Sequence, residues 1–293
     1  MPSLIRTLAA GGLLAALAHN APAQDPATPP VVAGRAAVQR NDADGAIAAF
    51  AAAVKADDRN ADLHFQLGTA YSLKARDGNL FAKARAASRM RDEWEQAISL
   101  DSTHYDAHES LYQFYKEAPA IMGGNVDKTL REQSAMLRLR PYQAGVYFAN
   151  QDYRSKRFAE SADRSHALAA AYPDSVAPTV LFVNTRLEQR RFDEAWAAID
   201  AARAHHGDVQ PLLYLVGRAA AISGMRLSQG QSALESIIAA PATGVSVSGA
   251  HFRLGNIRER LGDTAAARHE YETALRLDPK NVQAKQALDH LGA

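Results

Sequence analysis

The sequence predicts an all-α chain of repeated helix pairs, and three observations predict it. Hydrophobic residues make up 47% of the 293 positions and aromatic residues only 7%, with alanine frequent throughout. Alanine has the highest helix propensity, and its small side chain allows close helix packing. Long runs of β-branched residues, which would indicate buried strands, are nearly absent. The third observation is an internal repeat whose length suits two short helices.

The first 23 residues are typical of a cleavable signal peptide. Arg6 supplies a positive charge, residues 8–18 are largely apolar, and Ala21-Pro22-Ala23 fits the small-x-small cleavage rule. The alternative is a membrane anchor, for which the apolar stretch is too short. We therefore expect a mature chain that begins at Gln24 and is periplasmic or secreted. The alanine- and arginine-rich composition favours a Gram-negative periplasm.

Charge and cysteine content exclude several classes of partner. Loss of Arg6 leaves 32 Lys and Arg residues from 33, against 32 Asp and Glu residues, so the mature formal charge is zero. This balance argues against a nucleic-acid groove and against a basic membrane-binding face. The sequence has no cysteine, so the exported chain must be stable through packing alone and has no lipid-attachment cysteine.

The repeat is clearest near the C-terminus, in a unit that begins at Ser248. Small residues at its positions 8, 20 and 27 suit the crossing of two helices, and large residues at 7 and 24 fill the space beside them. A glycine at 15 can end the first helix in a left-handed conformation, and a proline at 32 stops the second. These residues are Leu254, Gly255, Gly262, Ala267, Tyr271, Ala274 and Pro279.

This pattern resembles the tetratricopeptide repeat family, whose 34-residue unit is a pair of antiparallel helices. The same spacing recurs from residue 27 onward. It predicts units at 27–60, 61–104, 105–141, 142–175, 176–209, 210–247 and 248–281, with a capping helix at 282–291. The resemblance implies one right-handed α-solenoid domain over residues 24–293. An irregular helical bundle is the alternative, and in-phase matches along most of the chain argue against it.

Two units are longer than the repeat requires. The second carries an insertion around Lys74–Arg85, and the third is lengthened by Ala118–Gly124. The block Tyr71–Pro141 resembles a set of exported bacterial tetratricopeptide proteins of undefined role. Those proteins share a lengthened second unit and an Ala-Pro…Gly-Gly turn. We expect Gly123-Gly124 to bend the chain rather than to cradle a ligand.

Tests for catalytic and metal-binding motifs fail, so we expect no enzyme, no cofactor and no metal site. His108-Glu109 begins like a zinc-protease helix, but Tyr112 stands where the second histidine should be. The chain also has no phosphate-binding Gly-Lys-Ser/Thr loop. His104 and His108 are four residues apart, and we interpret them as surface histidines at a helix start rather than as metal ligands.

Two further groups of residues have simple interpretations. Trp94 and Trp196 fall at or near position 24 of their units, so we expect both in the core. The segment Phe81–Arg91 is rich in basic residues, but acidic residues follow it, and a solvated helix face is expected.

In the tetratricopeptide family, the first helix of each unit lines the concave side, with positions 2, 5, 9, 12 and 13 facing the groove. Position 9 is polar in units two to seven, which suits the N–H and C=O groups of an extended peptide. We expect these side chains to be solvent-exposed, with two aromatic residues at position 5 beside them. The predicted groove residues are Thr69, Gln113, Asn150, Asn184, Tyr214, Arg218, Phe252 and Asn256. An ordinary wet surface is the alternative interpretation.

The family's C-terminal carboxylate clamp is not predicted, because Asn150 has Val146 before it and Leu181 in the next unit. The resemblance favours a non-catalytic periplasmic scaffold or adaptor that binds a protein segment. The alternative is an envelope or secretion accessory that acts through self-assembly or convex-face contacts. An enzyme or small-ligand carrier is the third class, which the failed motifs disfavour. The expected partner is a protein or peptide, with no nucleic acid and no stable membrane insertion.

Overall fold

The computed structural model describes residues 28–77, 79–242 and 245–292. The predicted signal peptide and Gln24 lie outside this part of the chain. The regular elements within it are fifteen α-helices and one short 3-10 helix, with no strand. The prediction of an all-α repeat fold is confirmed.

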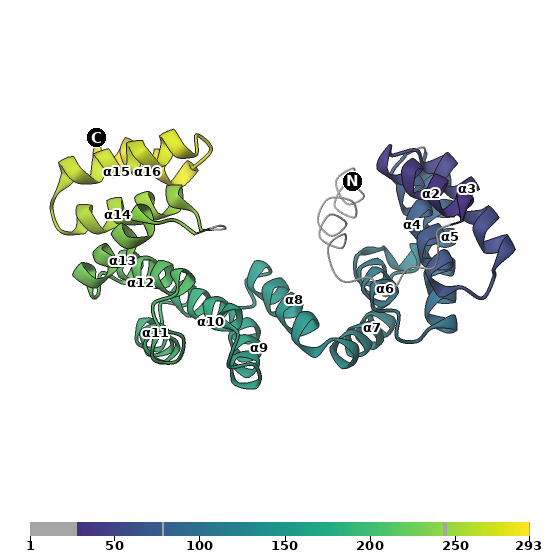
Figure 1. The fold of residues 1–293 in the computed structure, drawn as a ribbon, viewed down its shortest axis with the longest axis horizontal. Helices are drawn as coiled ribbons and strands as arrows, with labels where there is room; N and C mark the ends of the chain where they lie inside the picture. Colours follow the sequence, from purple (N-terminus) through teal and green to yellow (C-terminus); the bar gives the residue numbers. More distant parts are fainter. Residues whose placement is uncertain (1–27, 78, 243–244, 293) are drawn as a thin grey trace. The chain divides into compact units, whose positions relative to one another are not determined.

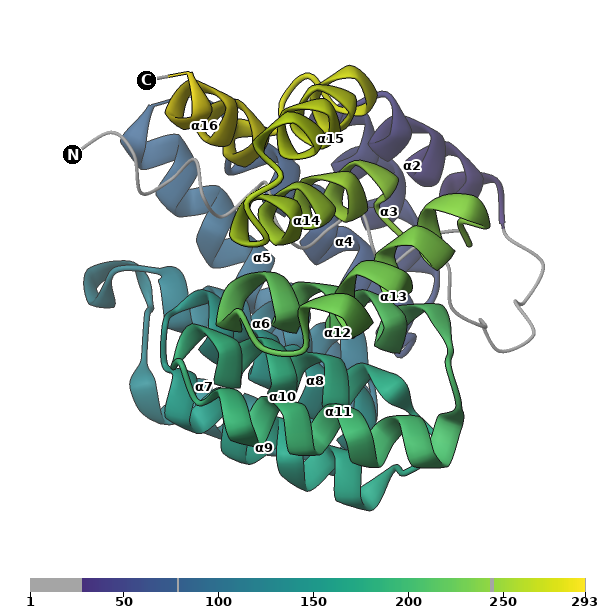
Figure 2. The ribbon, with the colours of Figure 1, turned by 90° about the vertical axis from the view of Figure 1, so that its left-hand side faces the viewer.

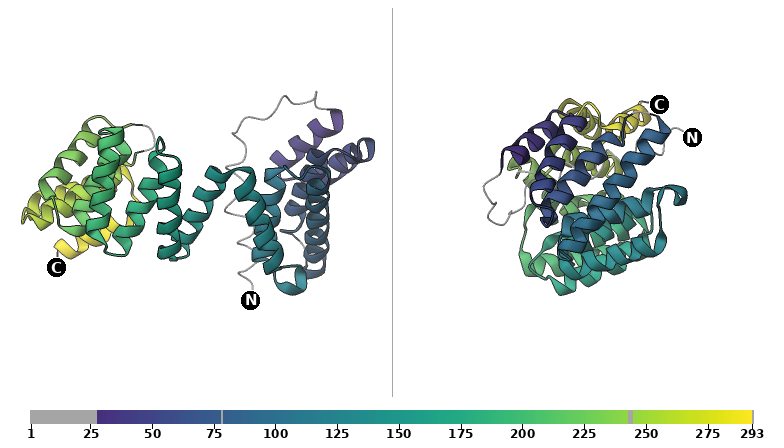
Figure 3. Two further views of the ribbon diagram at one scale, coloured as in Figure 1. Left: turned by 90° about the horizontal axis from the view of Figure 1, so that it is seen from below. Right: turned by 90° about the vertical axis from the view of Figure 1, so that its right-hand side faces the viewer.

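The helices follow one another as antiparallel pairs (Figures 1 and 3). They fall into two compact units, one ending at Pro141 and one beginning at Tyr142. We call these the N-terminal and C-terminal units and describe each by itself. The prediction of a single domain stays a prediction.

The N-terminal unit contains three pairs. Its helices are α2 (Pro29–Gln39), α3 (Ala43–Ala56), α4 (Ala61–Lys74), α5 (Leu80–Leu100), α6 (Tyr105–Glu117) and α7 (Val126–Leu139), with the 3-10 helix η1 (Ala120–Met122) between the last two. The C-terminal unit contains four pairs and a final helix. Its helices are α8 (Pro141–Arg154), α9 (Phe158–Ala171), α10 (Val176–Glu188), α11 (Phe192–His206), α12 (Gln210–Ser223), α13 (Leu227–Ala239), α14 (Val247–Arg260), α15 (Thr264–Leu277) and α16 (Val282–Leu291).

Helix ends are set by capping residues in the sequence. The Asn60 side chain accepts a hydrogen bond from the Leu63 amide at the start of α4, and Asp263 does the same for Ala266 in α15. Between α14 and α15, Gly262 has φ 84°, as expected of a residue that ends the first helix of a unit.

Several pairs cross where a glycine of the first helix faces a large side chain of the second. A Cβ atom added at Gly255 would lie 2.4 Å from the Tyr271 ring, and one at Gly68 would lie 2.5 Å from the Trp94 ring. Ala267 and Ala274 are fully buried, as predicted. Small residues at these points therefore allow the helices to approach.

The core follows the helix pairs. Trp94 packs in a cluster with Met90, Leu111 and Phe114 in the N-terminal unit. Trp196 is only 1% exposed and belongs to the largest cluster of the C-terminal unit, which joins α10 to α14. The prediction that both tryptophans are core residues is confirmed.

The insertions lengthen α5 and add η1. Gly123 has φ 105°, and a Cβ atom at Gly124 would lie 1.8 Å from the Ala118 carbonyl oxygen. Only glycine fits both positions, so the pair bends the chain as predicted. Phe81, at the start of α5, is 85% exposed, in agreement with a solvated face.

The last helix, α16, packs against α15 through the buried Ala284, and Val282 on α16 remains exposed. The Arg268 side chain donates a hydrogen bond to the Leu291 carbonyl oxygen, 3.1 Å away. Across the described ranges, no helix has the length and apolar character that crossing a membrane requires.

Candidate binding face of the C-terminal unit

The first helices of three successive pairs form a row in the C-terminal unit. Helix α10 packs against α12, and α12 packs against α14, as Figures 1 and 2 show. The second helices, α11, α13 and α15, pack mainly against helices adjacent in sequence. Because the first helices of successive pairs contact one another, the free surface of these first helices forms the inner side of this stack.

Polar side chains lie on this row in pairs spaced four residues apart, so each pair shares a helix face. Asn184 and Glu188 lie on α10, and Tyr214 and Arg218 lie on α12. The Arg218 Nη2 atom donates a hydrogen bond to Glu188 Oε1, 3.1 Å away. The Tyr153 hydroxyl of α8 donates to the same oxygen at 3.2 Å. Glu188 therefore connects three helices.

Arg253 extends this set to α14. Its guanidinium lies 4.8 Å from the centre of the Phe252 ring, and no carboxylate among the described residues forms an ion pair with it. Burial lowers the pKa of Arg253, and the charge of Arg218 lowers it further, while Tyr214 and Glu188 oppose this fall only in part. Arg253 is therefore a cation placed beside another cation.

Several polar atoms of this set are buried without a hydrogen-bond partner in the described part of the chain. They are the Asn184 Oδ1, Arg218 Nε and Arg253 Nε atoms. We call Asn184, Glu188, Tyr214, Arg218 and Arg253 the inner face. It presents one amide, one hydroxyl and two guanidinium groups against a single carboxylate.

Comparison with known proteins identifies the repeat. Residues 248–281, the last helix pair of the C-terminal unit, match the family model described as tetratricopeptide repeat. The chain therefore contains at least one tetratricopeptide repeat. No curated protein sequence matches it.

Solved structures show that the tetratricopeptide fold extends over most of the chain. One is the C-terminal part of a repeat-containing protein from Cytophaga hutchinsonii, with a TM-score of 0.55 and 12% identity over 87% of this chain and 98% of that one. Another is a tetratricopeptide repeat protein from Parabacteroides merdae, with a TM-score of 0.53 and 13% identity. The match covers 90% of this chain and 98% of that one. A third is PilW, described as a type IV pilus biogenesis factor, with a TM-score of 0.51 and 16% identity. The match covers 78% of this chain and 98% of that one. At these identities the likeness concerns the fold.

In the structure, the predicted position-9 residues lie at partly buried sites rather than at exposed ones. The expectation that these side chains are solvent-exposed therefore holds only in part, because several of them form hydrogen bonds within the fold. The Thr69 hydroxyl donates to the Phe65 carbonyl oxygen at 2.9 Å, and the Asn150 amide donates to that of Val146 at 2.8 Å. Asn256 accepts a bond from the Tyr271 hydroxyl at 3.4 Å. Gln113 is also partly buried.

The predicted residues belong to different parts of the molecule. Thr69 and Gln113 lie in the N-terminal unit, and the other six lie in the C-terminal unit. Phe252 corrects a further expectation, because it is only 7% exposed and packs against Tyr271 with the ring centres 5.9 Å apart. It supports Arg253 from the core side and offers no free apolar contact.

The interpretation of His104 and His108 as surface residues also needs correction. His104 caps α6 by accepting from the Ala107 amide, and its Nε2 atom lies 3.0 Å from Asp62 Oδ1. His108 is buried, with Nδ1 2.5 Å from Glu132 Oε2. The two rings therefore serve separate structural contacts. No group of three or more potential metal ligands occurs among the residues described.

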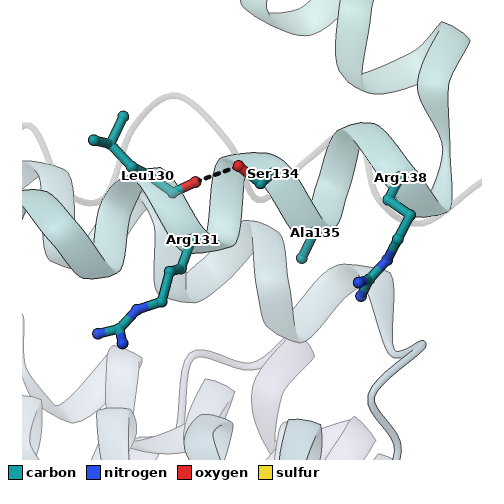
Figure 4. Close-up of a pocket in the computed structure, with 5 residues that line it drawn as sticks. All are labelled: Leu130, Arg131, Ser134, Ala135 and Arg138. Carbon is teal, nitrogen blue, oxygen red and sulfur yellow. Dashed lines mark hydrogen bonds between the residues drawn. The ribbon is translucent and has the colours of Figure 1, made fainter.

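A surface hollow on α7 offers no comparable site. Its lining consists of Leu130, Arg131, Ser134, Ala135 and Arg138, all from one helix (Figure 4). The Ser134 hydroxyl donates to the Leu130 carbonyl oxygen within the helix at 2.8 Å. Polar groups from other elements do not converge there, in contrast to the inner face.

Sequence reasoning missed Arg253, although a signal was present. Arg253 precedes Asn256 by three residues, and residues three apart lie on the same side of a helix. Asn256 is a predicted groove residue, so its helix face already pointed to Arg253. The buried contact between His108 and Glu132 had a signal as well, because units two and seven also carry a histidine at their fourth position, His64 and His251.

Proposed function

We propose that the protein is a non-catalytic interaction scaffold whose inner face binds an extended segment of a partner protein. The observation that carries this proposal is the set of buried, unpartnered polar atoms on Asn184, Arg218 and Arg253. A buried polar atom without a partner costs about 1–3 kcal/mol, so a ligand that supplies the missing bonds removes a penalty present in the free protein. A peptide backbone offers both donors and acceptors at regular spacing.

The location that fits this proposal is the periplasm. Arg6, the apolar stretch that follows it and the Ala-Pro-Ala segment support export. A partner in the cell envelope is then expected, and its contact with the inner face needs neither a cofactor nor a metal.

A photo-cross-linking experiment tests the proposal. A photoreactive phenylalanine replaces Asn184 on the inner face or, as the control, the exposed Glu272 on α15. Each purified protein is irradiated in envelope extract, and the attached peptide is sequenced and synthesised. We expect one recurrent segment from the Asn184 variant, and binding of its synthetic form to the unmodified protein. Equal labelling from both positions, or a synthetic segment that does not bind, would contradict the proposal.

A second candidate function is self-assembly through the N-terminal unit. Ile121 is 95% exposed, Val126 is 76% exposed and Leu130 is 55% exposed. Large apolar side chains on a surface are frequent in association sites. If this function holds, the purified protein forms oligomers in light scattering, and Ile121→Ser with Val126→Ser shifts them to monomer. A monomeric unmodified protein would exclude it.

A further inference from the structure

The inner face carries more positive than negative charge at its centre. Arg218 and Arg253 contribute two guanidinium groups, and Glu188 contributes one carboxylate. Glu188 Oε1 already accepts bonds from Arg218 and from the Tyr153 hydroxyl. One positive charge therefore lacks a counter-charge within the described part of the protein.

That unbalanced charge is held in place by neighbouring groups. The Arg218 side chain is only 19% exposed, and its Nε atom has no partner. On α14, the Phe252 ring lies beside the Arg253 guanidinium, and Gly249 leaves room for the Tyr214 hydroxyl, since a Cβ atom there would lie 2.6 Å from it. Side chains fixed in this way lose little freedom when a ligand binds.

We propose that Arg218 and Arg253 together bind a carboxylate of the partner segment, with Asn184 hydrogen-bonding the segment beside it. This inference rests on the proposed function and specifies its chemistry. Guanidinium groups match a carboxylate in shape and can donate paired hydrogen bonds to it. The excess of one positive charge is balanced by one carboxylate, whereas a phosphate group would add nearly two negative charges.

The carboxylate has two possible sources in a protein segment, an acidic side chain or the chain's C-terminus. A random dodecamer peptide library displayed on phage, selected against the full mature chain, supplies the probes. Each enriched peptide is synthesised with its C-terminus free or amidated, and with each Asp or Glu replaced by Asn or Gln. We expect one position, side chain or C-terminus, at which loss of the carboxylate weakens binding roughly 10- to 100-fold.

Protein variants then connect that carboxylate to the arginines. Arg253→Gln and Arg218→Gln should each weaken binding of the acidic peptide, and the neutral peptide should bind the variants and the unmodified protein alike. Arg276→Gln is the matched control, because it removes the same charge from an exposed position on α15. Glu188→Gln should instead tighten binding of the acidic peptide, because it removes the carboxylate that competes for Arg218.

Separate outcomes overturn the two proposals. If no peptide is enriched, or if none competes with labelling at Asn184, the proposed function fails. If peptides bind the inner face but tolerate loss of every carboxylate, the arginine inference fails while the binding function stands. It also fails if Glu188→Gln weakens binding in a protein whose unfolding temperature is unchanged. Arg253→Met provides a second variant, because replacing a half-buried, unpaired cation should leave the protein folded.

Discussion

At the scale of single residues, the same contact between histidine and glutamate occurs in three helix pairs. In each, a histidine near the start of the first helix meets a glutamate on the second helix, with 2.5–2.7 Å between the closest atoms. The pairs are His64 with Glu93, His108 with Glu132, and His251 with Glu270. Their recurrence at one register position indicates a structural role in joining the two helices.

The surroundings of His108 favour its charged form. Nε2 lies 3.1 Å from the Ser102 carbonyl oxygen, and Nδ1 faces Glu132, so both ring nitrogens face acceptors. The hydrogen bond with Glu132 raises the pKa of His108, and the Ser102 carbonyl adds to this, while burial opposes both. A histidine whose pKa is raised in the folded state stabilises the fold below its unfolded pKa of about 6.5, and this contribution is lost as pH rises through the folded pKa.

The first prediction concerns this pair. Glu132→Gln should lower the free energy of unfolding by about 1–3 kcal/mol at pH 6. The difference from the unmodified protein should shrink as pH rises through the raised pKa of His108, because the ring is then neutral in both proteins. Urea unfolding across this pH range measures it, with His205→Asn at an exposed position as the control. A difference that grows as pH rises would contradict the assignment of charge.

Residue-scale contacts of this kind were only partly predictable. Trp94 could be placed in the core because a large residue at that point of the second helix must face the small residue at position 8, which is Gly68. Trp196 falls in the corresponding helix of its unit and is also buried. The burial of His108 was indicated only by the repeat of a histidine at the fourth position of three units, since a single histidine fits a solvated helix start equally well. Phe252 was placed on the wrong side for a related reason, because position 5 borders both the groove and the next helix pair.

At the scale of elements, the crossing of α14 and α15 depends on small residues. Gly255 lies against the Tyr271 ring, and Ala274 is fully buried in the same cluster. The spacing of these residues predicts the helix pair because small and large positions alternate at the crossing. The length of α5 and the presence of η1 follow no such rule, and the sequence indicated only that extra residues lay there.

The second prediction tests this crossing. Ala274→Trp should overpack it and lower the free energy of unfolding by about 1–3 kcal/mol or more. Gly255→Ala should also destabilise, although alanine favours helices by about 1 kcal/mol over glycine, because its Cβ atom would collide with Tyr271. Thermal unfolding monitored by circular dichroism measures both. Tolerance of Ala274→Trp without loss of stability would show that the two helices do not cross there.

At the scale of the whole molecule, export is the feature that the sequence predicts and the described residues do not reach. The third prediction is that Leu14→Arg, which places a charge in the apolar stretch, leaves uncleaved precursor in the cytoplasm. Mass spectrometry of the unmodified protein from the envelope fraction should find Gln24 at its N-terminus. An intact Met1 in that fraction would contradict the predicted cleavage.

We predict that the loss of an inner-face side chain can weaken binding of the partner segment without lowering the stability of the protein. Asn184 gives the sharpest case, because its Oδ1 atom has no partner within the described protein, so Asn184→Ala removes no internal bond of that atom. A lost hydrogen bond to a ligand should cost about 0.5–1.5 kcal/mol of binding free energy.

The most direct measurement is a calorimetric titration of the cross-linked segment, in synthetic form, against the unmodified protein and Asn184→Ala, with a thermal unfolding curve for each. The account predicts weaker binding by Asn184→Ala, with an unfolding temperature no lower than that of the unmodified protein. Unchanged affinity, or an unfolding temperature that falls sharply with this single change, would contradict the claim that the inner face is a binding surface.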